Sequence, residues 1–289
     1  LCAMNIEERI QAFAQLGTVL SNFETNREWK DFSCGLTREE FNEFNSLICG
    51  VKRNNGWFTE DNVRSAIKGI VSMLKASSLK EWVNKYQFET EKLKNVGVIM
   101  AGNIPMVGFH DLLCVLVSGN KIMAKLSSDD NLLLPAMVKM LEAIEPRFAH
   151  RIKFLPQLKE IEAVIATGSD NSARYFKSYF GKYPNIIRKN RTSIALLDGS
   201  ESEEELLKLG DDIFLYFGKG CRNITKIYLP EGYDLDKLFK AFYPHKEIIH
   251  HHKYANNYDY NKAIYLMNKA ELIENGFVML KQDESLYSP

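Results

Sequence analysis

The stretch "VGVIMAGNIPMVGFHDLLCVLVSGNKIMAK", residues 96–125, decides the fold. Its first six residues, 96–101, form a short apolar run bounded by turn residues, which predicts a buried strand. A helix is expected from Pro105 to Val117, because proline suits the first helical position. Residues 121–125 predict the next strand. A strand, a helix and a second strand joined by short loops are typical of a parallel pair.

The same alternation continues along the chain. Further strands are expected at 151–155, 161–167 and 193–198, and helices from about 132 to 145 and from about 170 to 180. Alternating strands and helices predict an α/β fold, in which helices cover both faces of a Rossmann-like parallel sheet. Such sheets bind ligands at the carboxyl ends of their strands. The loops after residues 101, 125 and 167 are therefore the first candidates for a site.

Two domains are expected, with a boundary near residue 199. Residues 1–199 combine N-terminal helices, two of them opened by capping boxes at Thr37–Glu40 and Ser78–Glu81, with the parallel sheet. Residues 200–289 hold a few helices, among them an acidic one at 200–212 and a long one near 259–274, and one or two strands, one of them at 224–229. So short a segment makes a small core, and this second α/β domain is interpreted as partial, incomplete at its C-terminus.

Composition excludes several classes of protein. Lys plus Arg and Asp plus Glu both number 37, which argues against a general binder of nucleic acids or anionic membranes. No apolar run approaches the roughly 20 residues that span a bilayer. The five cysteines show no CxxC spacing and no signal peptide is visible, so reduced thiols in the cytoplasm are expected. His250–His252 are consecutive and cannot all face one ion, so no metal site is expected.

Small and polar residues follow three of the expected strands. Asn103 is either the cap of the next helix or a polar group that faces a ligand. Lys125 is either a solvated lysine or a contact for ribose hydroxyls or a phosphate, and Ser128 lies in the loop after it. Thr167–Ser169 is small enough for a pyrophosphate to approach its backbone and hydroxyls. The common dinucleotide fingerprint GxGxxG is absent from the sequence.

Cys221 lies in "DIFLYFGKGCRNITKIYLP", residues 212–230, between a glycine-containing loop and the expected strand. An isolated cysteine is usually a buried structural residue. Here Gly218 and Gly220 allow a ligand to approach the backbone, and Lys219 and Arg222 would favour a thiolate if they pointed inward. Cys221 is therefore the strongest candidate for a nucleophile.

Taken in order, these segments resemble the LuxC-type acyl-CoA reductases, a branch of the aldehyde dehydrogenase superfamily. The resemblance covers residues 95–230, and its motifs are "VGVIMAGNIPMVGFHDLLCVLVSGNKIMAKLSS", "VIATGSD", "RKNRTSIALLDG" and "FGKGCRNITKIYLP". It implies an aldehyde-dehydrogenase-like fold. Residues 1–199 would then include the dinucleotide-binding domain, and residues 200–289 would be the catalytic-cysteine domain.

The resemblance also assigns roles to individual residues. Cys221 matches the nucleophile, and the side-chain amide of Asn103 matches the donor that helps to form the oxyanion hole. Lys125 matches the lysine that contacts the adenosine ribose. Thr167, Gly168 and Ser169 match the loop beside the pyrophosphate and nicotinamide of the cofactor.

Two departures refine the expected chemistry. The superfamily's hydrolytic members carry a water-activating Glu after the last strand of the cofactor domain, and here that run is Ala195–Asp198, with no acid at the expected place. NAD-preferring members commonly carry a Glu three residues after the matched lysine, and here that residue is Ser128. The resemblance thus implies reduction of a long-chain fatty acyl-CoA to the aldehyde through an acyl-cysteine, with NADPH preferred over NADH.

Two other functions remain open at this point. One is a cysteine acyltransferase or thioesterase on the same fold, and the other is a non-catalytic subunit of a fatty-acid reductase complex. The expected partners are the acyl-CoA substrate and either a second copy of the chain or a protein that activates or accepts the acyl group. No nucleic acid and no membrane span are expected.

Overall fold

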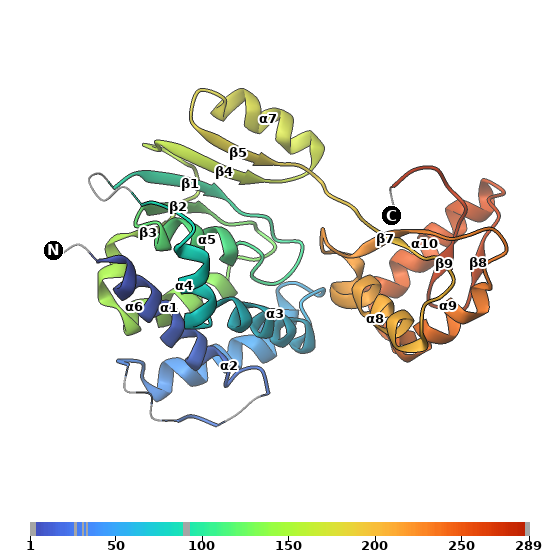
Figure 1. Ribbon diagram of the computed structural model, residues 1–289, viewed down its shortest axis with the longest axis horizontal. Helices are drawn as coiled ribbons and strands as arrows, with labels where there is room; N and C mark the ends of the chain where they lie inside the picture. The colour runs from blue at the N-terminus through green and yellow to red at the C-terminus, as the bar shows by residue number, and fades with distance from the viewer. Residues whose placement is uncertain (1–3, 26–27, 31, 33, 89–92, 287–289) are drawn as a thin grey trace. The chain divides into compact units, whose positions relative to one another are not determined.

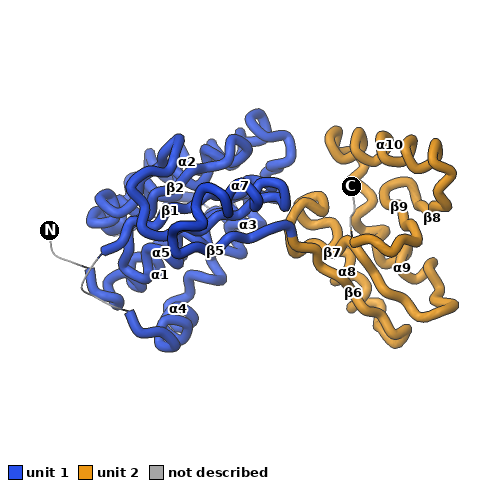
Figure 2. The backbone as a smooth tube through the Cα atoms, turned by 90° about the horizontal axis from the view of Figure 1, so that it is seen from above, with its two compact units in different colours: residues 1–190 blue, residues 191–289 orange. Residues whose placement is uncertain are grey.

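The computed structural model describes residues 4–25, 28–30, 32, 34–88 and 93–286. The chain divides into two compact units, unit 1 at residues 1–190 and unit 2 at residues 191–289 (Figure 2). Unit 1 contains the larger sheet, and unit 2 contains Cys221.

Unit 1 is built on a parallel sheet with the strand order β3-β2-β1-β4-β5 (Figure 1). The strands are β1 (Asn95–Ile99), β2 (Lys121–Lys125), β3 (Ile152–Phe154), β4 (Ala163–Thr167) and β5 (Asn185–Arg188). Val98 at the centre of β1 is fully buried and lies opposite Ala124 of β2 and Ile165 of β4. The predicted Rossmann-like parallel sheet is confirmed, and its strand order reverses between β1 and β4.

The connecting helices of this sheet are α5 (Phe109–Val117), α6 (Leu133–Ile144) and α7 (Asp170–Phe180). The connections from β1 to β3 run one way across the sheet, and the connection from β4 to β5 runs the other way. Right-handed crossovers therefore place α5 and α6 on one face and α7 on the opposite face. In Figure 1, α7 lies beside β4 and β5, away from α5 and α6.

Two details of unit 1 differ from the expectations. The helix expected from Pro105 begins instead at Phe109, because Met106 adopts a left-handed backbone conformation with φ 54°. The edge strand β5 was not expected, because its four residues lack a buried alternating pattern and Ile186 is 54% exposed.

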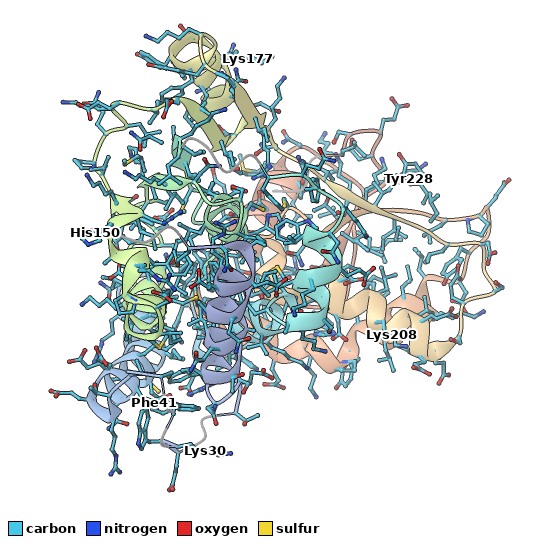
Figure 3. All side chains as sticks on the ribbon, turned by 60° about the vertical axis from the view of Figure 1, so that its left-hand side comes forward. Lys30, Phe41, His150, Lys177, Lys208 and Tyr228 are labelled. Carbon is cyan, nitrogen blue, oxygen red and sulfur yellow. The ribbon has the colours of Figure 1, made fainter. Side chains whose placement is uncertain are left out.

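The N-terminal helices pack on the face that carries α5 and α6. They are α1 (Ile6–Leu20), α2 (Arg38–Gly50), α3 (Glu60–Met73) and α4 (Ala76–Val83), with short 3-10 helices η1 (Val51–Arg53) and η2 (Pro146–His150). Phe13 of α1 makes edge contacts with Phe109 and Phe148. Phe23 stacks on Phe41 of α2 with ring centroids 4.2 Å apart, and Phe41 is labelled in Figure 3.

The two expected capping boxes have different outcomes. At Thr37 the box is confirmed, because Glu40 N–H donates to Thr37 Oγ1 and Thr37 N–H donates to Glu40 Oε2. The box at Ser78 is wrong, because α4 already begins at Ala76 and Leu79 N–H donates to the carbonyl of Lys75. Among the described residues, no helix has both the length and the apolar character that crossing a membrane requires.

Unit 2 has its own sheet and core. Its elements are β6 (Ser193–Leu196), α8 (Glu203–Phe214), η3 (Leu215–Gly218), β7 (Ile224–Tyr228), α9 (Leu235–Phe242), η4 (Tyr243–His250), α10 (His252–Met267), β8 (Ile273–Glu274) and β9 (Met279–Leu280). Strands β6 and β7 pair in parallel, and β8 pairs with β9 in antiparallel fashion. Phe214 of α8 packs against Phe242 of α9 and Phe277. The helix expected near 259–274 lies at 252–267.

The division between the units falls after Asn190, not near residue 199 as expected. The reason is the pairing of β6, which was expected in the sheet of the first domain. Ile194 and Leu196 of β6 instead lie opposite Lys226 and Tyr228 of β7. The strand therefore belongs to the unit that contains Cys221.

Candidate active-site loops

Asn103 lies in the loop after β1. A side chain on Gly102 would begin 2.6 Å from Cβ and Oγ of Ser127, so glycine lets this loop pack against the loop after β2. Met106 N–H donates a 2.6 Å hydrogen bond to Oδ2 of Asp130. Asn103 itself is half-buried, and α5 is preceded by Gly108, so the interpretation of Asn103 as the cap of that helix is wrong.

Asp130 is a buried carboxyl group that fastens the Asn103 loop. It is only 6% exposed, and its Oδ1 atom accepts no hydrogen bond from the described residues. Burial raises the pKa of Asp130 to about 6, while the hydrogen bond from Met106 N–H opposes the rise. The charge of this carboxyl group therefore changes within an ordinary working range of pH.

Lys125 and Ser128 lie at and beyond the carboxyl end of β2, and both are solvent-exposed. The backbone between them and Asp130 is fixed on two sides. Asp129 N–H donates to Ser127 Oγ at 3.2 Å, and the Asn55 side chain donates to the Asp129 carbonyl at 3.1 Å. The loop thus presents one ammonium group and one hydroxyl group to solvent from a fixed backbone.

The third loop follows β4. Thr167 ends the strand and is half-buried, and Ser169 caps α7 by accepting a hydrogen bond from Ser172 N–H at 3.1 Å. A side chain on Gly168 would begin 2.9 Å from Phe176 and Ser172, so the turn into α7 requires glycine. Such a helix start directs free N–H groups outward, which suits a phosphate.

These three loops gather at one edge of the sheet. Strands β2, β1 and β4 are neighbours and all run parallel, so their carboxyl ends lie side by side. The loops after β1 and β4 flank the point where the strand order reverses, which is where doubly wound sheets bind nucleotides. The structure therefore brings Asn103, Lys125, Ser128 and Thr167–Ser169 to a common edge of unit 1.

An ion pair between α5 and β5 lies beside Thr167. Both oxygens of Asp111 accept hydrogen bonds from Arg188 Nη1 at 2.7 Å, and the same nitrogen is 3.5 Å from Thr167 Oγ1. Burial opposes the ionisation of Asp111, but His110 and Arg188 outweigh it and lower its pKa. Asp111 and then Cys114 raise the pKa of the exposed His110.

Cys221 lies in unit 2, in the turn between η3 and β7, and its side chain is exposed. The residues before it have an unusual backbone. Tyr216, Phe217 and Gly218 are consecutive left-handed residues, with φ 54°, 59° and 73°. Only Gly218 adopts this region readily, so the two aromatic residues are held there by their surroundings.

Asn223, two residues after Cys221, is a functional candidate that the sequence did not reveal. It is 6% exposed, and its side chain accepts a hydrogen bond from Gly220 N–H at 2.7 Å. Asp130 was missed in the same way. Asparagine and aspartate are both common in turns, and only the structure shows that these two are buried.

The run that replaces the superfamily's water-activating Glu lies at the end of β6. Asp198 accepts hydrogen bonds from the hydroxyl and the N–H of Ser200, and these bonds lower its pKa. Its carboxylate is thereby committed to the turn that precedes α8 and is made a weaker base.

The fold of the chain is that of aldehyde dehydrogenases. The structure of glyceraldehyde-3-phosphate dehydrogenase from Methanocaldococcus jannaschii, solved with NADP, matches with a TM-score of 0.63 and 14% identity, over 100% of this chain and 72% of that one. Aldehyde dehydrogenase 21 from Physcomitrella patens, solved with succinate, matches with a TM-score of 0.58 and 14% identity, over 84% of this chain and 56% of that one. Lactaldehyde dehydrogenase from Escherichia coli gives a TM-score of 0.60 and 13% identity, over 85% and 52%. The chain thus spans little more than half the length of the last two.

Within this fold, the sequence defines the family. The model of the acyl-CoA reductase (LuxC) family matches residues 1–239, and the chain belongs to that family. The match includes the N-terminal helices as well as residues 95–230, so the resemblance seen in the sequence is confirmed and extended. No curated protein matches the chain.

Proposed function

We propose that this chain carries the NADPH-dependent reduction of a long-chain fatty acyl-CoA to the aldehyde, through a thioester on Cys221. The observation that supports this most is the setting of Cys221 in a chain of the acyl-CoA reductase family. The thiol is exposed, and a left-handed backbone run and a buried asparagine fix the loop that carries it. A cysteine with only a packing role needs none of these features.

The first half of the proposed reaction is acyl transfer. The Cys221 sulfur, as thiolate, attacks the carbonyl carbon of the acyl-CoA and forms a new carbon–sulfur bond. The negative charge moves to the carbonyl oxygen, which receives hydrogen bonds from the Asn103 side-chain amide and the Cys221 backbone N–H. The charge then returns to form the carbonyl again, and the CoA sulfur leaves and takes up a proton.

The second half requires a reductant. A nicotinamide cofactor, when bound, would supply the hydride that reduces the acyl group. The edge of unit 1 is suited to such a cofactor, because the strand order reverses between β1 and β4 and the loops there are fixed and small. Lys125 and Ser128 would bind the adenosine end, and Thr167–Ser169 at the start of α7 would bind the pyrophosphate. Asn103 again stabilises the oxyanion, and Cys221 is released as thiolate when the aldehyde forms.

The environment of Asp198 argues against the thioesterase alternative. Hydrolysis of an acyl-cysteine needs a base to activate water. Asp198 accepts two hydrogen bonds from Ser200, and its pKa is lowered. Asp198 is therefore a poor base for hydrolysis of a thioester on Cys221, which favours reduction or transfer to a thiol.

The test is a panel of acyl-CoAs of different chain lengths, each incubated with the protein and either NADPH or NADH. The proposal predicts that nicotinamide oxidation, CoA release and aldehyde formation occur in equal amounts. CoA release without nicotinamide oxidation would instead identify an acyltransferase or thioesterase. No CoA release and no acyl adduct with any chain length would leave only the non-catalytic subunit.

A further inference from the structure

The side chain of Asn223 is completely used in hydrogen bonds to the backbone around Cys221. Its Oδ1 atom accepts from Gly220 N–H at 2.7 Å, and its Nδ2 atom donates to the carbonyls of Asp212 and Leu215, each at 2.9 Å. Asn223 N–H also donates to the Gly220 carbonyl at 2.9 Å. One buried amide thus joins the end of α8 to the residue that precedes the thiol.

The segment between these anchor points is the left-handed run. Tyr216 has φ 54° and ψ 29°, Phe217 has φ 59° and ψ 29°, and Gly218 has φ 73°. Residues with side chains avoid this region unless the surrounding structure holds them there. Asn223 bonds to Leu215, which immediately precedes the run, and to Gly220, which lies two residues after it. The stacking of Phe217 on His251, with ring centroids 4.2 Å apart, is a second restraint.

We propose that Asn223 is the positioning residue of the Cys221 loop, an inference that rests on the proposed function for its catalytic meaning. Its amide holds residues 215–220 in the left-handed turn and thereby orients the Cys221 thiol and backbone N–H. Asn223 does not itself touch the substrate, because its polar atoms are committed to Gly220, Asp212 and Leu215. Without this amide, two carbonyls and one N–H group lose a partly buried hydrogen bond, and the turn relaxes toward ordinary backbone angles.

A role of Asn223 in orienting Cys221 and a role in stability alone predict different results for two reactions of the Cys221 thiol, acylation and alkylation. Acylation by acyl-CoA needs the thiol and the oxyanion donor in a fixed geometry, whereas alkylation by iodoacetamide needs only access to the thiol. Asn223→Ala should slow acylation of Cys221 by roughly 10- to 100-fold, because misplacement by about 1 Å has effects of this size. Iodoacetamide labelling of Cys221 should change by less than about threefold. Amide hydrogen exchange should accelerate in residues 215–221 and stay unchanged in α9 and α10.

Two matched controls accompany this variant. Asn261→Ala removes a half-buried asparagine whose side chain donates to the Asn257 carbonyl of the same helix, α10, and it should change neither reaction. Gly218→Ala strains the same turn, because residues with a side chain rarely adopt φ 73°, and it leaves Asn223 itself unchanged. Gly218→Ala should slow acylation by about tenfold. Gly232→Ala introduces the same kind of strain, at φ 75°, in a loop farther along the chain from Cys221, and it should leave acylation unchanged. If Asn223→Ala does not fold, the comparison of the two glycine variants decides.

Several results would overturn the inference. Unchanged acylation and unchanged local exchange in Asn223→Ala would show that the turn does not depend on this amide. Faster exchange throughout unit 2, with acylation and alkylation altered together, would show a role in stability alone. If the wild-type protein forms no acyl adduct, the proposed function fails and the exchange experiment alone decides. Acceleration confined to residues 215–221 then supports the positioning role, and no acceleration there contradicts it.

Discussion

The loop that carries Asn103 and the loop that carries Cys221 are both held by a buried polar side chain, but the two side chains differ in chemistry. Each contains left-handed residues, Met106 in the first and Tyr216–Gly218 in the second. Each is fastened by one buried polar side chain, 6% exposed in both cases, that accepts a hydrogen bond from a backbone N–H. In the Asn103 loop that side chain is Asp130, and in the Cys221 loop it is Asn223.

The difference lies in what the two side chains can do with protons. Asn223 is neutral at every working pH, and both ends of its amide have partners. Asp130 titrates with a pKa of about 6, and its Oδ1 atom accepts no hydrogen bond from the described residues. The fastening of the Cys221 loop by Asn223 is therefore expected to be insensitive to pH, whereas the fastening of the Asn103 loop by Asp130 is expected to change with pH.

The largest effect is expected at Cys221 itself. Cys221→Ala removes the proposed nucleophile and should abolish acyl-CoA reduction, while binding of NADPH, which we propose for unit 1, should stay nearly intact. Steady-state turnover and a titration of nucleotide fluorescence measure the two properties. Cys49→Ala, at another exposed cysteine, is the control and should remain active. Residual turnover in Cys221→Ala would place the chemistry elsewhere.

Asn103→Ala should slow acylation by roughly 100- to 1000-fold, the usual effect of removing one oxyanion donor. Asn103 does not cap α5, so the loss of about 1 kcal/mol that follows removal of a helix cap is not expected. Single-turnover acylation and thermal unfolding, measured on the same preparation, separate the two effects. Asn42→Ala, at an exposed position of α2, is the control. A lower melting temperature with normal acylation would mean that Asn103 only supports the loop.

Asp130→Asn tests the pH sensitivity of the first loop. The folded-state pKa of Asp130 is raised from 3.8 to about 6, so the folded state loses stability as pH rises through this window. At about 1.4 kcal/mol per pKa unit, the loss reaches about 3 kcal/mol above the folded-state pKa. Asparagine keeps the acceptor for Met106 N–H and carries no charge.

Urea unfolding of unit 1 at pH 4 and at pH 7.5 measures this effect. The free energy of unfolding of Asp130→Asn, relative to wild type, should increase by about 2 to 3 kcal/mol between the two values. Asp129→Asn, the exposed neighbour, should show no such change. A difference between Asp130→Asn and wild type that is the same at both pH values would contradict the raised pKa.

The smallest effect concerns the exposed loop after β2. Ser128 and Lys125 can bind a 2′-phosphate, so the wild type should prefer NADPH. Ser128→Glu adds a like charge and should shift the ratio of kcat/KM for NADPH over NADH toward NADH by about tenfold, if one pair of charges near the surface is worth about 1.4 kcal/mol. Ser128→Ala is the control for loss of the hydroxyl alone. A wild-type preference for NADH would show that the 2′-position is recognised by other residues.

The sequence predicted those strands and loops that a local pattern of apolar and turn residues defines. Strong apolar runs identified β1, β2 and β4, and the loops after them proved to share one edge of the sheet. Strand β5 was missed because its residues, Asn185–Arg188, lie at an exposed edge and show no apolar alternation. The partner of β6 was missed because strand pairing is a contact between distant segments, which local pattern does not encode.

The candidate site shows the same limit. Cys221 and Asn103 were identified by residue type and by their place after apolar runs. Asp130 and Asn223 were not, because their importance comes from burial and from the backbone groups that they contact. The sequence could not exclude Asn103 as the N-cap of the next helix. No residue pattern near it indicates that Met106 adopts a left-handed conformation and that α5 begins only at Phe109.

The most direct test of the central claim is mass spectrometry of the full chain mixed with a long-chain acyl-CoA and no nucleotide. Three other described cysteines, at 34, 49 and 114, provide internal comparisons, and Cys114 lies 3.7 Å from a nitrogen of His110. If Cys221 is the nucleophile, one acyl group is added, and it is found on the peptide that contains Cys221. An adduct on Cys49 or Cys114, or no adduct on Cys221, would contradict the account.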